Sequence, residues 1–320
     1  MGRLLSLLVA VCIASAQAVR AESFPSKTVT LVVPFAAGSG TDTVARLLGH
    51  HLTAALGQTV IVENKAGANG VIAASYVARS APDGHTLLVA TNTTHSANPA
   101  GMIKNVPYDA VKDFAPVSRV GTYIFVLVVN PEIPARSLQE LIAYGKANPG
   151  KLSFASGNGT GIVAGKALGH WTGLDLLHVP YKSTPPAVND VLGGRVSMIF
   201  VDLITTLSHI QAGSLRALAV TTRERTALLP DLPSLHEQGL ENYDITSWCG
   251  IFAPAGTPPE AVGRLNAELR RIIGSAEVKK RLADVGFEAI SSSPEQLGQF
   301  VGDQLVLWKR LIKDTGIEAQ

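Results

Sequence analysis

The feature that most constrains the fold is a regular alternation of short β-branched runs with amphipathic helical patterns. Residues 28–33 and 86–91 are rich in Val, Leu and Thr and predict strands. Between them, residues 41–56 place apolar side chains on one side of a helix, and Gly57 is expected to end it. Strands separated by helices of this length are typical of parallel βαβ units. The wholly apolar run at residues 125–129 indicates a strand buried on both faces.

The same alternation restarts after Pro134. Ser137 and Glu140 have the spacing of a capping box, which predicts a helix that runs to Ala147. The pattern then continues as alternating strands and helices at residues 151–155, 161–171, 176–179, 186–192, 196–201, 204–212 and 215–221. The chain therefore contains two α/β blocks, and each is long enough to bury its own core.

The last third of the sequence is predicted to be mostly helical. Capping-box patterns at residues 257–260 and 293–296 each precede apolar residues at helical spacing. No Gly/Ser-rich linker separates the parts of the chain. We expect an α/β fold of two lobes, each a mostly parallel sheet flanked by helices, with a ligand cleft between them. The expected domains are residues 22–121 together with 248–320, and residues 122–247.

The first 21 residues have the layout of a secretory signal peptide. Arg3 supplies a positive charge, residues 4–14 form an apolar run, and small residues offer cleavage after Ala18 or Ala21. A membrane-spanning helix would need about 20 apolar residues, and this run is shorter. Cleavage after Ala21 takes Arg3 and Arg20 from the 27 basic side chains and leaves 25, which equals the number of acidic ones. We expect an exported, neutral protein in the periplasm of a Gram-negative bacterium.

Cysteine content and charge exclude several classes of protein. Cys12 belongs to the expected leader, so Cys249 is left alone and can form neither an intrachain disulfide nor a zinc site with several cysteines. Its apolar neighbours predict a buried packing role. An exported chain of this length without disulfides fits a bacterial periplasm. The net charge of only +2, without a Lys/Arg cluster, argues against a nucleic-acid partner.

Sequence signatures of catalysis are mostly missing. Ser39 lies in a Gly-Ser-Gly run that lacks the spacing of a nucleophile elbow. His50 and His51 are adjacent on a predicted helix, where they diverge by about 100° and do not share a metal ion. The glycine-rich run at residues 157–161 has Ile162 where a dinucleotide fingerprint needs its third glycine. We therefore expect no cofactor and no metal.

Four polar loops, each between a predicted strand and the helix that follows it, are the candidate binding segments. They are rich in Gly, Ser, Thr and Asn and comprise residues 34–42, 91–98, 155–160 and 180–184. In open α/β sheets, ligands bind outside the carboxyl ends of the strands. Free N–H groups at helix amino termini favour an anion there. The loops therefore predict a carboxylate that is held without a formal Arg partner.

Each loop also has a purely structural interpretation. Gly-Ser-Gly before a helix is often turn and cap chemistry alone. Asp42 and Asp202 could serve only as helix caps, and Lys182 could be a solvated surface side chain. Because two loops come from each α/β block and all four stand at the same kind of strand end, together they favour one common cleft.

Several of these segments resemble the Bug family, the substrate-binding proteins of tripartite tricarboxylate transporters, which is also called the TctC family. Residues 33–46 (VPFAAGSGTDTVAR) are similar to the first loop and helix of that family, and residues 62–70 (VENKAGANG) to its "ENKPGAGG" turn. Further matching motifs lie within residues 82–87, 179–182, 185–194 and 209–221. The resemblance extends over essentially the whole mature chain.

The resemblance implies a periplasmic Venus-flytrap protein whose two α/β domains close on a small organic acid. Carried over position by position, residues 35–42, 91–95, 156–160 and 181–183 would line the cleft with Asp202. The ligand-binding candidates are Phe35, Ala36, Ala37, Ser39, Asp42, Thr91, Asn92, His95, Ser156, Gly157, Asn158, Gly159, Thr160, Tyr181, Lys182, Ser183 and Asp202. Ser39 and Ser183 stand where the family usually has Gly, and residues 92–95 lack its usual Gly, which affects ligand identity more than ligand class.

Three functions remain open from the sequence. The first is a monomeric, non-catalytic protein that captures a small organic carboxylate, such as a dicarboxylate, an aromatic acid or an amino-acid-like acid. It would close around that ligand and deliver it to the membrane subunits of a tripartite tricarboxylate transporter. The second is a receptor that reports the same ligand to a membrane sensor kinase. The third is a periplasmic hydrolase, for which the sequence offers only His95 near Ser39 as base and nucleophile.

Overall fold

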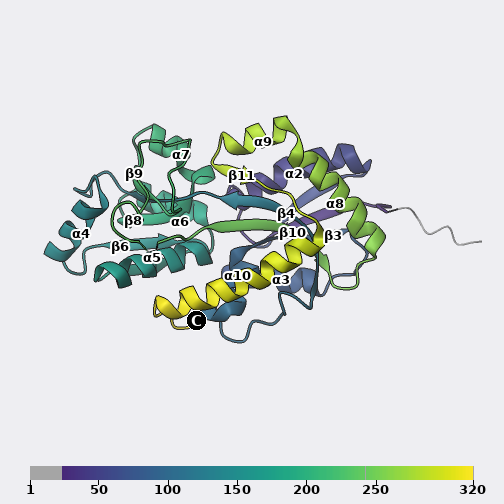
Figure 1. Ribbon diagram of the computed structural model, residues 1–320, viewed down its shortest axis with the longest axis horizontal. Helices are drawn as coiled ribbons and strands as arrows, with labels where there is room; N and C mark the ends of the chain where they lie inside the picture. The colour runs from purple at the N-terminus through teal and green to yellow at the C-terminus, as the bar shows by residue number, and fades with distance from the viewer. Residues whose placement is uncertain (1–23, 242, 320) are drawn as a thin grey trace, which may run out of the picture.

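The computed structural model describes residues 24–241 and 243–319, so the expected leader lies outside the described residues. The described chain forms two lobes that lie side by side along the long axis of the molecule (Figure 1). Each lobe contains one β-sheet with helices on both faces. The predicted α/β fold with two sheets flanked by helices is therefore confirmed. Within the described residues, no helix combines the length and the apolar character needed to cross a bilayer.

The sheet of the first lobe has six strands in the order β11-β4-β10-β3-β1-β2. β1 pairs in parallel with β2 and β3, whereas β10 runs antiparallel to both β3 and β4. This sheet is therefore mixed and not mostly parallel as predicted. No local sequence pattern predicted β4 or β10. The strands are β1 (Val29–Val33), β2 (Val60–Asn64), β3 (Thr86–Thr91), β4 (Phe114–Tyr123), β10 (Ser247–Pro254) and β11 (Phe287–Ala289).

Alternate residues of the first-lobe strands supply two cores, one on each face of the sheet. Leu31 and Val33 pack with α2, α8 and α9, while Val32 packs with α3 and α10 on the opposite face. Cys249 of β10 is fully buried in the first of these cores, as predicted, and burial raises the pKa of its thiol to about 12. The helices are α2 (Gly40–Leu56), α3 (Val71–Ala78), α8 (Pro259–Gly274), α9 (Ala276–Ala283) and α10 (Pro294–Asp314).

The second lobe has a five-stranded sheet in the order β7-β6-β8-β5-β9. Its strands are β5 (Phe125–Val129), β6 (Ser153–Ser156), β7 (Leu177–Pro180), β8 (Met198–Asp202) and β9 (Arg216–Val220). Every residue of β5 is buried, as its apolar run predicted. β5 nevertheless runs antiparallel to β8 and β9, because it enters directly from β4 of the first lobe rather than through a crossover helix.

Helices cover both faces of the second sheet. Val126 and Val128 of β5 face a core shared with α6 and α7, while Leu127 and Val129 face one shared with α4 and α5. The helices are α4 (Leu138–Ala147), α5 (Gly159–Thr172), α6 (Thr184–Leu192) and α7 (Leu203–Gln211).

Extended chain, rather than a flexible linker, joins the two lobes. Ile124 alone separates β4 from β5, and the return from β9 to β10 runs beside it. The Thr221 amide donates to the Phe125 carbonyl at 3.0 Å, and the Ile245 amide donates to the Thr221 carbonyl at 3.1 Å. Helix α10 also spans both lobes, because Leu297 belongs to a first-lobe core and Trp308 to a second-lobe core (Figure 1).

Helix caps test the predicted boundaries. Gly57 ends α2 in the left-handed conformation, at φ 69°, as predicted. The capping box that begins at Ser293 is complete. Ser137 caps α4 as predicted, but the carboxylate of Glu140 accepts from the Arg136 amide, so that box is only half formed. The box predicted at residues 257–260 is wrong, because the Thr257 hydroxyl donates back to the Pro254 carbonyl and leaves α8 without a side-chain cap.

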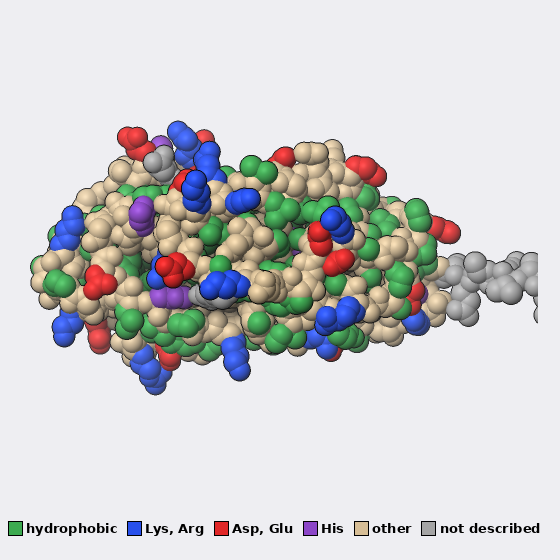
Figure 2. Space-filling view, turned by 90° about the horizontal axis from the view of Figure 1, so that it is seen from below, with side chains coloured by type: hydrophobic (Ala, Val, Ile, Leu, Met, Phe, Trp, Pro, Cys, Tyr) green, Lys and Arg blue, Asp and Glu red, His purple; other side chains and the backbone are tan. Residues whose placement is uncertain are grey.

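The surface seen from below carries charges of both signs (Figure 2). Lys and Arg side chains are interspersed with Asp and Glu on this face, and they do not gather into one field of a single sign. Several surface ion pairs, such as Lys280 with Asp284 at 2.8 Å, are exposed and contribute little to stability.

Candidate ligand-binding cavity

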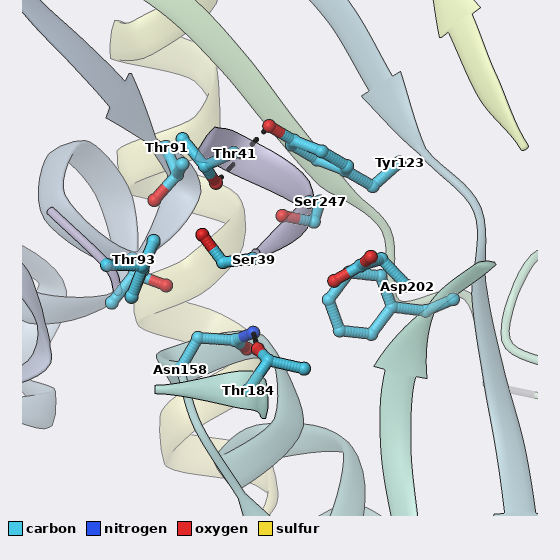
Figure 3. Close-up of a pocket in the computed structure, with 12 residues that line it drawn as sticks. Ser39, Thr41, Thr91, Thr93, Tyr123, Asn158, Thr184, Asp202 and Ser247 are labelled. Atoms are coloured by element: carbon cyan, nitrogen blue, oxygen red, sulfur yellow. Dashed lines mark hydrogen bonds between the residues drawn. The ribbon is translucent and has the colours of Figure 1, made fainter. Parts of the chain in front are cut away.

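A small cavity lies where the carboxyl ends of strands from both lobes meet the β4–β5 crossing (Figure 3). Its volume of about 10 Å³ is enough for about one water molecule. The first lobe thus closes against the second around a nearly filled space. The lining residues are Phe35, Ser39, Gly40, Thr41, Thr91, Thr93, Tyr123, Phe125, Asn158, Thr184, Asp202 and Ser247.

Helix α2 points its amino terminus at the cavity. Ser39 is the N-cap, and its hydroxyl accepts from the Asp42 amide at 3.3 Å. The amides of Gly40 and Thr41 belong to the first turn, where N–H groups have no acceptor within the helix. Tyr123 donates its hydroxyl hydrogen to the Thr41 hydroxyl at 3.3 Å, which fixes the cavity wall on that side (Figure 3).

Three helices of the second lobe also begin at this cavity. Asn158 caps α5 by accepting from the Gly161 amide at 2.9 Å. Thr184 is the first residue of α6, and the side chain of Asp202 caps α7. The sequence folds this way because each of these helices follows directly on a strand that ends at the same edge of the sheet. The positive ends of four helix dipoles therefore converge on one small volume.

Hydrogen bonds join distant segments around the cavity. The Ala36 amide of the first lobe donates to the Ser183 hydroxyl of the second at 3.0 Å. The Asn92 side-chain amide donates to the Thr160 hydroxyl at 2.7 Å and accepts from the Ser247 hydroxyl. These contacts involve all four polar loops predicted from the sequence: the first is joined to the fourth, and the second to the third. The Gly159 amide also donates to the Thr93 hydroxyl at 3.1 Å.

One hydroxyl at the cavity has no partner among the described residues. Thr91 is 2% exposed, and its Oγ1 atom is buried without a hydrogen bond. Figure 3 shows this hydroxyl turned toward the same space as those of Ser39 and Thr93. A buried hydroxyl without a partner costs on the order of 1–3 kcal/mol. A ligand oxygen placed in the cavity would remove that cost.

Asp202 is the ionisable carboxylate among the lining residues. Its Oδ1 atom accepts from the Thr205 amide at 3.1 Å and from the Thr205 hydroxyl at 3.0 Å. Burial raises the pKa of Asp202 to about 6, and the hydrogen bonds from Thr205 oppose that rise only in part. The group is thus mostly ionised at neutral pH and is kept in place by its capping role.

The predicted binding residues fall into three groups. Phe35, Ser39, Thr91, Asn158 and Asp202 line the cavity. Ala36, Asn92, Gly159, Thr160 and Ser183 form the hydrogen bonds that hold the surrounding loops together. The structure places the remaining candidates outside the lining, namely Ala37, Asp42, His95, Ser156, Gly157, Tyr181 and Lys182.

Contacts explain why several of the remaining candidates stay outside. The Asp42 carboxylate accepts from the Gly38 amide and from the side chains of Arg46 and Asn64, and these bonds outweigh the effect of burial and lower the pKa of Asp42. Tyr181 donates its hydroxyl hydrogen to Asp190. The Ser156 hydroxyl is hydrogen-bonded to His178, and Gly157 packs against the backbone of Ser183 and Thr184. Ala37 and Lys182 are exposed.

His95 lies in an aromatic core rather than at the cavity. Its ring centroid is 4.6 Å from that of Phe114 and 4.4 Å from that of Phe252, and its Nδ1 is 3.2 Å from the Thr94 hydroxyl. Complete burial lowers the pKa of His95 to about 3. The Ser39 hydroxyl is engaged as a helix cap, so the base and nucleophile of the hydrolase hypothesis do not form a pair.

Sequence reasoning missed three lining residues entirely. Tyr123 and Phe125 flank the crossing between the lobes, and Ser247 begins β10. None of them lies in a polar loop after a parallel strand, which was the pattern used to find the site. Four more lining residues lie within the predicted polar loops although they were not among the individual candidates, namely Gly40, Thr41, Thr93 and Thr184.

Known proteins match this chain over nearly its whole length. The family model described as "TctC: Tripartite tricarboxylate transporter family receptor" matches residues 44–317. The periplasmic binding protein BugD is 35% identical, with 93% of this chain and 100% of that one covered and a TM-score of 0.89. The description of the family is that of a receptor and not of an enzyme.

Two further similar solved structures are described with a ligand. R. palustris Rpa4515 with adipate is 34% identical, with 93% of this chain and 100% of that chain covered and a TM-score of 0.90. MatC (Rpa3494) from Rhodopseudomonas palustris with bound malate is 33% identical, with 90% and 100% covered and a TM-score of 0.86. The fold, the extent of the matches and the family model agree. The chain therefore belongs to the TctC (Bug) family of periplasmic solute-binding proteins, the receptors of tripartite tricarboxylate transporters.

Proposed function

We propose that this protein captures a small organic carboxylate between its lobes and delivers it to the membrane subunits of a tripartite tricarboxylate-type transporter. The observation that carries the proposal is the convergence of four helix amino termini, those of α2, α5, α6 and α7, on one cavity. The described lining contains no Lys, Arg or His. Oriented amides and hydroxyls are then the groups that would stabilise an anion there.

Closure of the lobes is the mechanism that fits this cavity. In the arrangement described here, the cavity holds about one water molecule, so an organic acid would enter only after the lobes separate. The acid would then favour the closed state through contacts that only that state provides. The moving bodies in this proposal are residues 22–121 with 248–320 and residues 122–247, with the hinge at Ile124 and Ile245, where the chain crosses between the lobes.

With an acid enclosed, the cavity would be wider than the space for about one water molecule described here, and each group then has a proposed role. The amides of Gly40 and Thr41 and the unpartnered Thr91 hydroxyl would hold one carboxylate. Phe35 and Phe125 would form the apolar part of the wall. The binding of adipate by Rpa4515 and of malate by MatC supports the ligand class. Export by the leader that ends between Ala18 and Ala21, and action as a monomer, are part of the same proposal.

A ligand screen tests this function. We expect at least one of succinate, adipate, malate, aspartate and benzoate to raise the melting temperature of protein that has been unfolded and refolded to remove bound ligand. At a ligand concentration of 1,000 times Kd, the stabilisation is about 4 kcal/mol. Glucose serves as a neutral control. If none of the acids raised the melting temperature, or if glucose raised it as much as they did, the proposed function would be wrong.

A further inference from the structure

Asp202 occupies an unusual position for an acidic group in a cavity proposed to bind an anion. A Cβ atom added at Gly40 would lie 2.6 Å from Asp202 Oδ1 and 3.2 Å from Oδ2. The carboxylate of the second lobe is therefore packed against the first turn of α2. Figure 3 shows it at the side of the cavity, near Ser247, with its oxygens directed inward.

The charge of Asp202 has no cationic partner. No ion pair involves Asp202 in the part of the chain that the structure describes, and the other lining residues are neutral. The two hydrogen bonds from Thr205 both reach Oδ1, which is also the oxygen nearer to Gly40, so Oδ2 is the oxygen left for a ligand in the cavity that Asp202 lines. A buried carboxylate without a cationic partner is costly, so this side of the cavity favours a ligand that brings a donor to Oδ2.

The position of the missing donor follows from the closeness of the two groups. The proposed carboxylate subsite lies at the amides of Gly40 and Thr41, and the Asp202 carboxylate packs beside Gly40, in the space that a Cβ atom would need. A ligand whose carboxylate lies at this terminus can therefore reach Asp202 with a group on the very next carbon. An ammonium or hydroxyl group there would donate to Oδ2, whereas a second carboxylate at that place would be repelled.

We infer that Asp202 is a specificity-determining residue that selects α-amino or α-hydroxy acids over acids that carry no donor beside the carboxylate. This inference rests on the proposed function. It goes further by naming the class of ligand and the residue that recognises the donor group of that ligand. The remainder of the ligand would face Phe35 and Phe125, which are uncharged and do not distinguish these acids from one another.

The variant Asp202→Asn tests the inference, because Asn retains a cap for α7 and nearly the same volume while it removes the charge. Titration calorimetry with succinate, malate and aspartate compares four-carbon diacids that differ in the group beside one carboxylate. We expect the wild type to bind malate or aspartate at least tenfold more tightly than succinate. In Asp202→Asn, the preference for aspartate over succinate falls at least tenfold.

Asp190→Asn is the matched control, because Asp190 lies on α6 outside the cavity lining, bonded to Tyr181 and Arg195. This variant is expected to keep the wild-type preference. The inference is overturned if wild type binds succinate as tightly as aspartate and malate, or if Asp202→Asn retains the wild-type preference. If no organic acid binds the wild type at all, the failure is that of the proposed function.

Discussion

Replacing Gly40 with Ala is expected to lower the affinity for the carboxylate ligand by about 100-fold or more, which is roughly 2.7 kcal/mol, while both lobes stay folded. Gly40 is the first residue of α2, and Ala has a higher intrinsic helix propensity than Gly. In the closed arrangement, however, the new Cβ would lie 2.6 Å from Oδ1 and 2.9 Å from Cγ of Asp202. Thr205 holds that carboxylate in place, so it cannot easily move aside.

Calorimetry and small-angle X-ray scattering measure this effect. The wild type should become more compact when the tightest-binding acid is added, and Gly40→Ala should not. Gly49→Ala is the matched control in the same helix, because its new Cβ would meet no atom closer than 3.7 Å. A second change, Asp202→Ser, removes the collision and should restore compaction to Gly40→Ala. Wild-type affinity and compaction in Gly40→Ala would show that the lobes do not close in this way.

Acidification is expected to destabilise the protein through His95, whose pKa is lowered to about 3 by complete burial. The unfolded chain binds a proton on this side chain near pH 6.5, and the folded chain does not. The stabilising effect of keeping His95 neutral is therefore fully present above pH 6.5 and is lost as the pH falls toward 3. The loss is about 1.4 kcal/mol for each pH unit, or about 5 kcal/mol in all.

Urea unfolding between pH 7.5 and 4.5 tests this prediction by comparing variants. His95→Phe keeps a ring between Phe114 and Phe252 and should flatten the fall in unfolding free energy on acidification. Phe252→Leu in the same core is the control, which should lower stability by a similar amount at every pH. Asp202 has a raised pKa and changes stability in the opposite direction, but it is common to all three proteins and cancels. An unchanged pH slope in His95→Phe would refute the assignment.

Much of the fold could be predicted because local pattern and tertiary structure agree. The strand at Val29–Val33 and the helix that Gly57 ends follow from β-branched runs, helical spacing and cap chemistry. The antiparallel strands β4 and β10 could not be found in this way. β4 contains Pro116 and Gly121, and its residues form a strand because β10 and β11 pair with it on either side. Tertiary pairing, not local propensity, decides such strands.

The candidate site shows the same division. Its polar loops were predictable because strand ends in an α/β sheet gather at one edge. Which polar side chain of a loop turns inward was not predictable. Ser39 lines the cavity, whereas the Asp42 carboxylate, three residues on, is drawn away by Arg46 and Asn64. His95 likewise lies away from the cavity, because its ring packs against Phe114 and Phe252, which are not its neighbours in the sequence.

A crystal structure with the tightest-binding acid tests the central claim most directly. We predict one ligand carboxylate within hydrogen-bond distance of the Gly40 and Thr41 amides and the Thr91 hydroxyl, enclosed by both lobes. The ligand would make no ion pair with Lys or Arg. An acid bound outside this cavity, or held there by a basic side chain such as Lys182, would contradict the account.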